Sequence, residues 1–123
     1  MAFREHLQHG DAAIRQAQEW LRDNYSHPNP VAVVETRSGL SPRSFKRRFK
    51  EATDLSALNY VQQLRIDKAK SHLENGDLSV DAISWKVGYE DAAFFNRLFK
   101  RITGLTPSAY RKKFRLPTSS FSQ

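Results

Sequence analysis

The sequence of 123 residues contains no cysteine. This absence excludes disulfide bonds, thiolate nucleophiles and cysteine-based zinc fingers, and it fits a reducing compartment. The sequence also lacks any run of about eighteen apolar residues, and its first ten residues carry His and Glu where a signal peptide has an apolar core. We therefore expect a cytoplasmic protein with no membrane span and no membrane partner.

Motifs of common enzyme classes are missing as well. The sequence has no nucleophile elbow, no HExxH pair and no phosphate-binding glycine loop. His6 and His9 have the i, i+3 spacing of a metal-binding pair, but no carboxylate or cysteine completes such a site. We predict that the protein is not an enzyme and has no catalytic residue, metal or cofactor.

The chain is short, and residues that begin or end helices occur along it at regular intervals. Glycine and proline, five of each, fall between the apolar patterns, and Ser, Thr or Asp precede these patterns as helix caps. Apolar residues spaced by three to four positions predict an all-α fold. About seven helices are expected, over residues 12–24, 31–38, 42–53, 57–75, 80–87, 92–103 and 107–114.

The sequence contains an internal repeat. Each copy consists of a short helix, a glycine turn and a second, basic helix, which is the helix-turn-helix arrangement. Gly39 aligns with Gly88 at a shift of 49 residues, and a shift of 50 aligns the rest. The pairs are Phe45 with Phe95, Arg47 with Arg97, Phe49 with Phe99, Lys50 with Lys100, Thr53 with Thr103, Leu55 with Leu105, and Tyr60 with Tyr110.

The net charge of +7 is unevenly distributed. Residues 1–91 hold thirteen basic and thirteen acidic residues, so the excess comes from residues 92–123, with seven basic residues and no acidic one. Residues 37–50 form a second basic block, with six basic residues and no acidic one. Two basic blocks favour a polyanionic partner with two points of contact.

The expected helix 42–53 carries the first basic surface. Phe45 and Phe49 mark its buried side, and four basic residues occupy the opposite side. Four like charges at i, i+3, i+4 and i+7 destabilise a helix unless an anion neutralises them, as duplex phosphates and guanine edges do. The predicted DNA-binding residues here are Arg43, Lys46, Arg47 and Lys50.

The expected helix 92–103 carries the second surface. Asparagine pairs with adenine, arginine with guanine, and alanine contacts the thymine methyl group. We expect the first basic helix to discriminate between sequences and the second to anchor the protein. The predicted DNA-binding residues are Ala93, Asn96, Arg97 and Lys100, and the predicted phosphate contacts are Arg111, Lys112 and Lys113.

The long helix 57–75 sets the spacing of the two units. Its length of about 28 Å, with the width of the flanking helices, approaches the roughly 34 Å of one B-DNA turn. We therefore expect the helices 42–53 and 92–103 to enter successive major grooves of double-stranded DNA. A tandem repeat in one chain predicts an asymmetric site of two unlike half-sites.

Several short segments occur in a fixed order along the chain. They are Gly39-Leu40-Ser41-Pro42-Arg43, Phe45-Lys46-Arg47-Arg48-Phe49-Lys50, Tyr60-Val61 with Leu64-Arg65, Ile83 with Val87-Gly88-Tyr89, Phe94-Phe95-Asn96-Arg97-Leu98-Phe99-Lys100-Arg101, and Gly104-Leu105-Thr106-Pro107 with Tyr110-Arg111. Together these segments resemble the AraC/XylS family of bacterial transcription regulators over about residues 11–114. The resemblance implies a first helix-turn-helix subdomain (11–54), a linker helix (55–76) and a second subdomain (77–114). It also implies a transcription activator that binds specific DNA at the nucleoid and works with RNA polymerase.

Most members of that family carry an effector or oligomerisation domain ahead of this one, for which 123 residues leave no room. A stand-alone regulator and a fragment of a longer one are both open. Residues 3–11 resemble the linker of regulators of the GlxA type, which favours the fragment. Residues 1–10 are then a linker from a missing upstream domain, the only route for a small-molecule effector, and residues 115–123 are expected to be a disordered tail.

Other interpretations stay open. A non-specific architectural or RNA-binding module lacks support from an RNP motif or a GxxG clamp, and a basic domain for an acidic protein partner is electrostatically permitted. The sequence does not decide whether Arg65 meets the core or a phosphate, and it leaves Phe94 open. The aromatic residues expected in the core are Phe45, Phe49, Phe95, Phe99, Tyr60, Tyr110 and Trp85.

Overall fold

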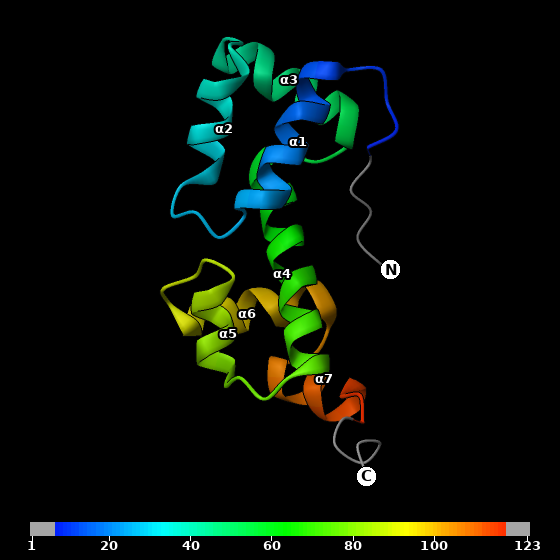
Figure 1. Cartoon of the computed structure of the whole chain (residues 1–123), viewed down its shortest axis with the longest axis vertical. Coiled ribbons are helices and arrows are strands. Elements are labelled where there is room, and N and C mark those ends of the chain that lie inside the picture. The colour runs from blue at the N-terminus through cyan, green and yellow to red at the C-terminus, as the bar shows by residue number, and fades with distance from the viewer. Residues whose placement is uncertain (1–6, 118–123) are drawn as a thin grey trace. The chain divides into compact units, whose positions relative to one another are not determined.

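The computed structural model describes residues 7–117, and the ends of the predicted linker and tail, with His6, lie outside this range. The described part is all-α and contains no strand, as predicted (Figure 1). α2 begins at Pro30 and α5 ends at Lys86, each one residue earlier than expected. The helices are α1 (Ala12–Asn24), α2 (Pro30–Ser38), α3 (Pro42–Thr53), α4 (Ala57–Asn75), α5 (Val80–Lys86), α6 (Ala92–Thr103) and α7 (Pro107–Phe114).

Side-chain caps fix where the helices begin. Ser41 accepts a hydrogen bond from the backbone N–H of Ser44 (3.2 Å), and Asp91 accepts from those of Ala93 and Phe94 (2.9 and 3.2 Å). These bonds satisfy donors that the first turn of a helix leaves free. The other capping residues with such bonds are Asp11, Ser56, Ser79 and Thr106.

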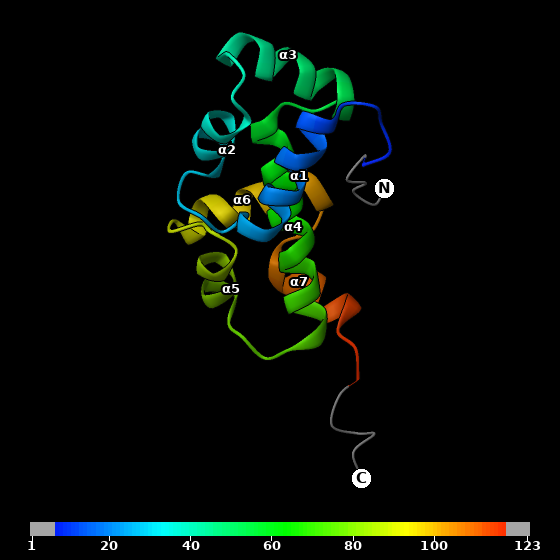
Figure 2. The same cartoon turned by 45° about the horizontal axis from the view of Figure 1, so that its top comes forward.

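The chain divides into two compact units between Leu64 and Arg65, within α4. In the first unit, α1, α2 and α3 pack around the first half of α4 (Figures 1 and 2). Its core is a cluster of fully or nearly fully buried side chains. Each large apolar side chain in it contributes roughly 1.5–3 kcal/mol by leaving water. The cluster comprises Ile14, Ala17, Leu21, Val34, Phe45, Phe49, Tyr60, Val61 and Leu64.

The second unit repeats the aromatic packing of the first. The ring centroids of Phe49 and Tyr60 lie 5.3 Å apart in an edge-to-face arrangement, and those of Phe99 and Tyr110 lie 5.4 Å apart in the same way. Such pairs stabilise a core beyond the area they bury. The two aligned threonines also match, since Thr53 and Thr103 each donate to the carbonyl four residues earlier at 2.8 Å. The repeat read from the sequence is thus a structural repeat.

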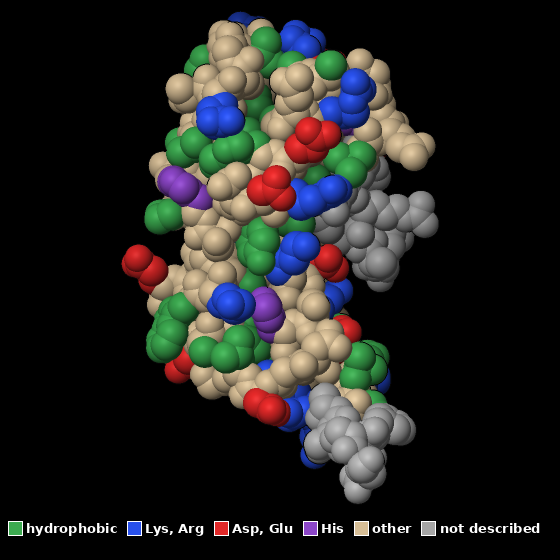
Figure 3. Space-filling model, in the orientation of Figure 1, with side chains coloured by type: hydrophobic (Ala, Val, Ile, Leu, Met, Phe, Trp, Pro, Cys, Tyr) green, Lys and Arg blue, Asp and Glu red, His purple; other side chains and the backbone are tan. Residues whose placement is uncertain are grey.

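The burial of two side chains, Trp85 and Arg65, shows which of them belongs to the core. The prediction that Trp85 is a core residue is wrong, because Ile83 and Ser84 of the short α5, with Val87 directly after it, are buried and leave Trp85 59% exposed. Apolar side chains accordingly gather on the surface over α5 (Figure 3). Arg65 is only 7% exposed, and its guanidinium lies 4.7 Å from the centroid of the Tyr89 ring, so it belongs to the core of the second unit.

Candidate nucleic-acid interface

The basic face of α3 lies on the surface of the first unit. Arg43, Lys46, Arg47 and Lys50 are all exposed, while Phe45 and Phe49 on the opposite side are fully buried. Within the described part of the chain, Arg43 and Lys46 form no hydrogen bond or ion pair. These two side chains therefore need break no contact to reach an anion.

The other two cations of this face make weak local contacts. Arg47 Nη1 lies 3.4 Å from Glu51 Oε1, in an ion pair whose side chains are 60% and 63% exposed. Exposed pairs of this kind contribute at most about 1 kcal/mol. Lys50 Nζ donates to the carbonyl of Asp54 at the end of α3 (2.7 Å). A phosphate or a guanine edge competes readily with both contacts.

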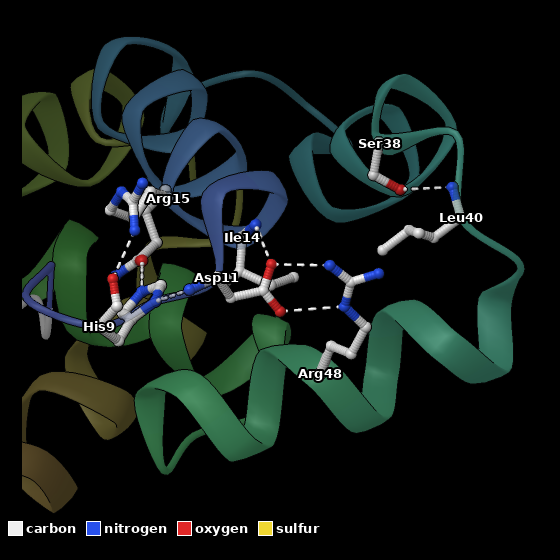
Figure 4. A network of polar contacts seen from close by, with 8 residues as sticks. His9, Asp11, Ile14, Arg15, Ser38, Leu40 and Arg48 are labelled. Carbon is white, nitrogen blue, oxygen red and sulfur yellow. Dashed lines mark hydrogen bonds and ion pairs between the residues drawn. The ribbon is translucent and has the colours of Figure 1, made fainter.

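Arg48, on the same helix, does not belong to this face. Its Nε and Nη2 donate to the two carboxylate oxygens of Asp11 at 2.9 and 2.8 Å (Figure 4). Because the bonded Arg48 guanidinium stabilises the charged carboxylate, the pKa of Asp11 falls to about 2. Asp11 also caps α1, so this bidentate pair ties the start of α1 to the middle of α3.

A second set of polar contacts holds the residues just ahead of α1. His9 Nε2 lies 2.7 Å from Gln18 Oε1, and the fully buried Gln18 donates to the hydroxyl of Tyr60 (3.2 Å). Arg15 donates to the carbonyl of His9 (Figure 4). Residues 9–11 are therefore joined both to the core of the first unit and to α3.

The outward face of α6 carries less charge than that of α3. Ala93, Arg97 and Lys100 are exposed, but Asn96 is half-buried and its Nδ2 donates to the carbonyl of Ala92 (2.7 Å). The amide of Asn96 thus has a partner in its own helix, which a bidentate contact with adenine has to replace. Of the predicted residues of α6, Arg97 and Lys100 supply its charge.

The three predicted phosphate contacts on α7 differ in their surroundings. Lys112 and Lys113 are exposed. Arg111 is half-buried, and its Nε and Nη2 donate to the carbonyls of Leu73 (3.2 Å) and Gly76 (3.4 Å) at the end of α4. Arg111 therefore satisfies carbonyls that the last turn of a helix leaves free. Its phosphate contact stays a prediction beside this structural role.

We expect Arg111→Ala to destabilise the second unit by about 1 kcal/mol, because carbonyls at the end of α4 lose their donor. Lys112→Ala serves as the matched control, since this neighbouring side chain is exposed. Thermal unfolding of both variants without DNA measures the difference. Equal stability of the two variants would show that the Arg111 contacts contribute nothing to folding.

Two further properties of the described residues bear on function. Between residues 7 and 117, no group of three His, Asp or Glu side chains is placed to hold a metal ion. No helix in the part of the chain that the structure describes combines the length and apolar character needed to cross a bilayer.

Two helix-turn-helix units, each with an exposed basic helix, define a DNA-binding domain of the tandem helix-turn-helix class. A family model described as a helix-turn-helix domain matches residues 35–113. The chain belongs to this family, the AraC-type helix-turn-helix transcription regulators. The closer resemblance to the GlxA type stays a prediction.

The chain is similar to known regulators in sequence and in structure. It is 32% identical over 108 residues to the transcriptional activator RhaS of Enterobacter sp. (strain 638), covering 88% of this chain and 39% of RhaS. The structure of the C-terminal domain of AraT from Geobacillus stearothermophilus superposes with a TM-score of 0.83 at 23% identity, over 87% of this chain and 89% of that domain. The chain spans 35–39% of the length of the curated relatives it matches.

A third similarity concerns a structure solved with DNA. The DNA-binding domain of AdpA, a global transcriptional factor, was determined in complex with a target DNA. It superposes on this chain with a TM-score of 0.80 at 26% identity, covering 85% of this chain and 94% of that domain.

Sequence reasoning missed the pairing of Arg48 with Asp11 and the contacts of Arg111 with α4. Both join residues at least 35 positions apart. The only signal in the sequence was that Arg48 falls beside the basic face rather than within it.

Proposed function

We propose that this domain binds a specific double-stranded DNA site and regulates transcription, with α3 and α6 inserted into successive major grooves. The observation that carries the proposal is the duplicated, exposed basic helix, whose α3 copy presents four exposed cations on one face, of which, within residues 7–117, Arg47 alone pairs with a carboxylate, that of the exposed Glu51. Like charges on one helix face repel one another and destabilise the helix unless an anion binds to them.

Two further observations support the proposal. α4 is one helix of 19 residues, with a length of about 28 Å, and this length suits two helices that enter grooves about 34 Å apart on one face of the duplex. The charge patterns of α3 and α6 differ, so we infer an asymmetric site of two unlike half-sites.

Selection of bound duplexes from a random pool tests the function. We expect one preferred asymmetric sequence that competes with random DNA by orders of magnitude, and binding that weakens steeply as salt rises. Equal affinity for selected and random duplexes at physiological salt indicates a non-specific module. Preference for single strands indicates an RNA-binding role, and no binding at low salt indicates a protein partner.

Arg47→Ala and Lys112→Ala separate base reading from phosphate contact. Arg47→Ala is expected to weaken binding to the selected site about tenfold and to relax the preference at one position, because a bidentate guanine contact is lost. Lys112→Ala is expected to weaken binding to all duplexes alike and to lower the salt dependence. Fluorescence anisotropy with the selected site and single-base variants measures both. A uniform loss for Arg47→Ala contradicts the assignment of Arg47 to base reading.

We propose that the remaining predicted residues also contact DNA. Lys113 adds a phosphate contact on α7. The residues that face DNA are Arg43, Lys46 and Lys50 on α3, and Ala93, Asn96, Arg97 and Lys100 on α6. A regulator of this kind works at the nucleoid in the cytoplasm, and we infer contact with RNA polymerase. We also infer that a small-molecule effector acts through an upstream domain of a longer protein.

A further inference from the structure

The edge of α6 beside its predicted DNA-binding residues carries an exposed aromatic side chain. Phe94 is 38% exposed in the first turn of the helix. Phe94, Arg97 and Arg101 follow at i, i+3 and i+7, so they line one edge of α6, and all three are exposed. Asn96, by contrast, is half-buried and bonded to its own helix. The exposed arc of α6 is thus turned towards Phe94 rather than towards Asn96.

The ring of Phe94 is held in place by the turn that precedes α6. Its centroid lies 5.6 Å from that of Tyr89, and the guanidinium of the buried Arg65 lies 4.7 Å from the same Tyr89 ring. Phe94 therefore rests on a fixed support while its other side faces solvent. A side chain fixed in this way loses little conformational entropy when it contacts a ligand.

The two copies of the repeat differ at this position. Ser44 occupies in α3 the place of Phe94, and Arg43 the place of Ala93. The start of α6 is therefore apolar where that of α3 is polar and basic. The cap differs too, because α6 has the carboxylate of Asp91 where α3 has the neutral Ser41. A carboxylate there disfavours a phosphate close to the first turn of α6.

The thymine C5-methyl group is the apolar feature of the major-groove edges, and phenylalanine is among the side chains that contact it. We propose that Phe94 contacts thymine methyl groups in the half-site bound by α6, and so determines sequence specificity there. The second unit then discriminates by apolar contact, in addition to anchoring the domain. This inference rests on the proposed function, since it requires that α6 enters the major groove.

Replacement of single thymines by deoxyuridine in the selected site tests the proposal, because it removes only the methyl group. With the full chain, we expect one or two positions in the α6 half-site at which affinity falls about fourfold, the effect of losing one buried methyl group. Phe94→Ala is expected to bind the thymine site more weakly and to bind thymine and deoxyuridine sites equally. Anisotropy titrations against each duplex measure these affinities.

Two further variants make the test selective. Trp85→Ala removes another exposed aromatic ring of the second unit that lies off α6, and it is expected to keep the full difference between thymine and deoxyuridine. Phe94→Leu keeps an apolar side chain if Phe94→Ala disturbs packing on Tyr89, and it is expected to retain part of the difference. The proposal is wrong if the wild-type protein binds thymine and deoxyuridine sites equally throughout the α6 half-site. It is also wrong if both Phe94 variants lose as much affinity on deoxyuridine substitution as wild type does. If the protein selects no duplex from the random pool, the proposed function itself is wrong.

Discussion

Gly88→Ala is expected to destabilise the second unit by about 3 kcal/mol. Gly88 has a φ of +112°, where a side chain strains the backbone by roughly 1–3 kcal/mol. A Cβ added there lies 2.9 Å from Cζ and Nη2 of Arg65. That guanidinium is buried and stacked on Tyr89, so it cannot withdraw without losing its own contacts. The strain and the contact together exceed what either costs alone.

Gly39→Ala is the matched control, because Gly39 holds the equivalent turn in the first unit. Its φ is +73°, and nothing lies within 4 Å of an added Cβ. Only the backbone cost of roughly 1–2 kcal/mol is expected there. Amide hydrogen exchange, read separately in α2–α3 and α5–α6, gives the opening free energy of each unit. Equal losses in the two variants would show that Arg65 yields without cost.

The double variant Arg65→Ala/Gly88→Ala isolates the contact. If the Arg65 guanidinium causes the extra cost, Gly88→Ala destabilises the Arg65→Ala protein by less than it destabilises wild type, because only the backbone strain remains. The coupling between neighbouring residues measures this directly. Independent, additive losses would mean that backbone strain alone explains the effect.

The helices could be predicted from the sequence because their signals are local. Ser41-Pro42, Asp91 and Thr106-Pro107 start helices at the expected residues, and the left-handed Gly39 and Gly104 end them. A cap needs only its own next three residues, so a short segment contains the whole signal.

The contacts between side chains could not be predicted in this way. Arg48 and Arg111 both lie in basic runs, yet each finds its partner on another helix. Trp85 lies outside the core because its neighbours Ser84 and Ile83, not the tryptophan, face the interior of the second unit. A helical pattern gives the direction of a side chain on its own helix, whereas the element that meets it depends on tertiary packing. The proposed base-contacting surface of α6 therefore could not be predicted from the sequence, because the exposure of Phe94 and the partial burial of Asn96 depend on tertiary packing.

The Asp11–Arg48 pair gives an acid-dependent stability to the first unit. At neutral pH, Asp11→Ala is expected to lower the stability of this unit by about 2 kcal/mol, since α1 loses its cap and α3 loses a bidentate partner. Asp11→Asn keeps a capping side chain but loses the charge and one of the two oxygens that accept hydrogen bonds from Arg48. We expect about half the effect for Asp11→Asn, because the carboxylate side chain is 21% exposed and solvent screens part of the attraction.

The pH dependence follows from the pKa of Asp11, which is about 2 in the folded protein and 3.8 in its unperturbed state. A lowered pKa means that the carboxylate stabilises the fold fully above about pH 4 and that this contribution is lost as pH falls towards 2. The difference between wild type and Asp11→Asn is therefore expected to be constant from pH 7 to 5 and to shrink below pH 4, as measured by urea unfolding. Asp23→Asn, which changes an exposed carboxylate of the same helix, is expected to shift stability by less than about 0.5 kcal/mol. A gap between wild type and Asp11→Asn that persists unchanged at pH 2 would show that the charge of Asp11 does not hold α1 to α3.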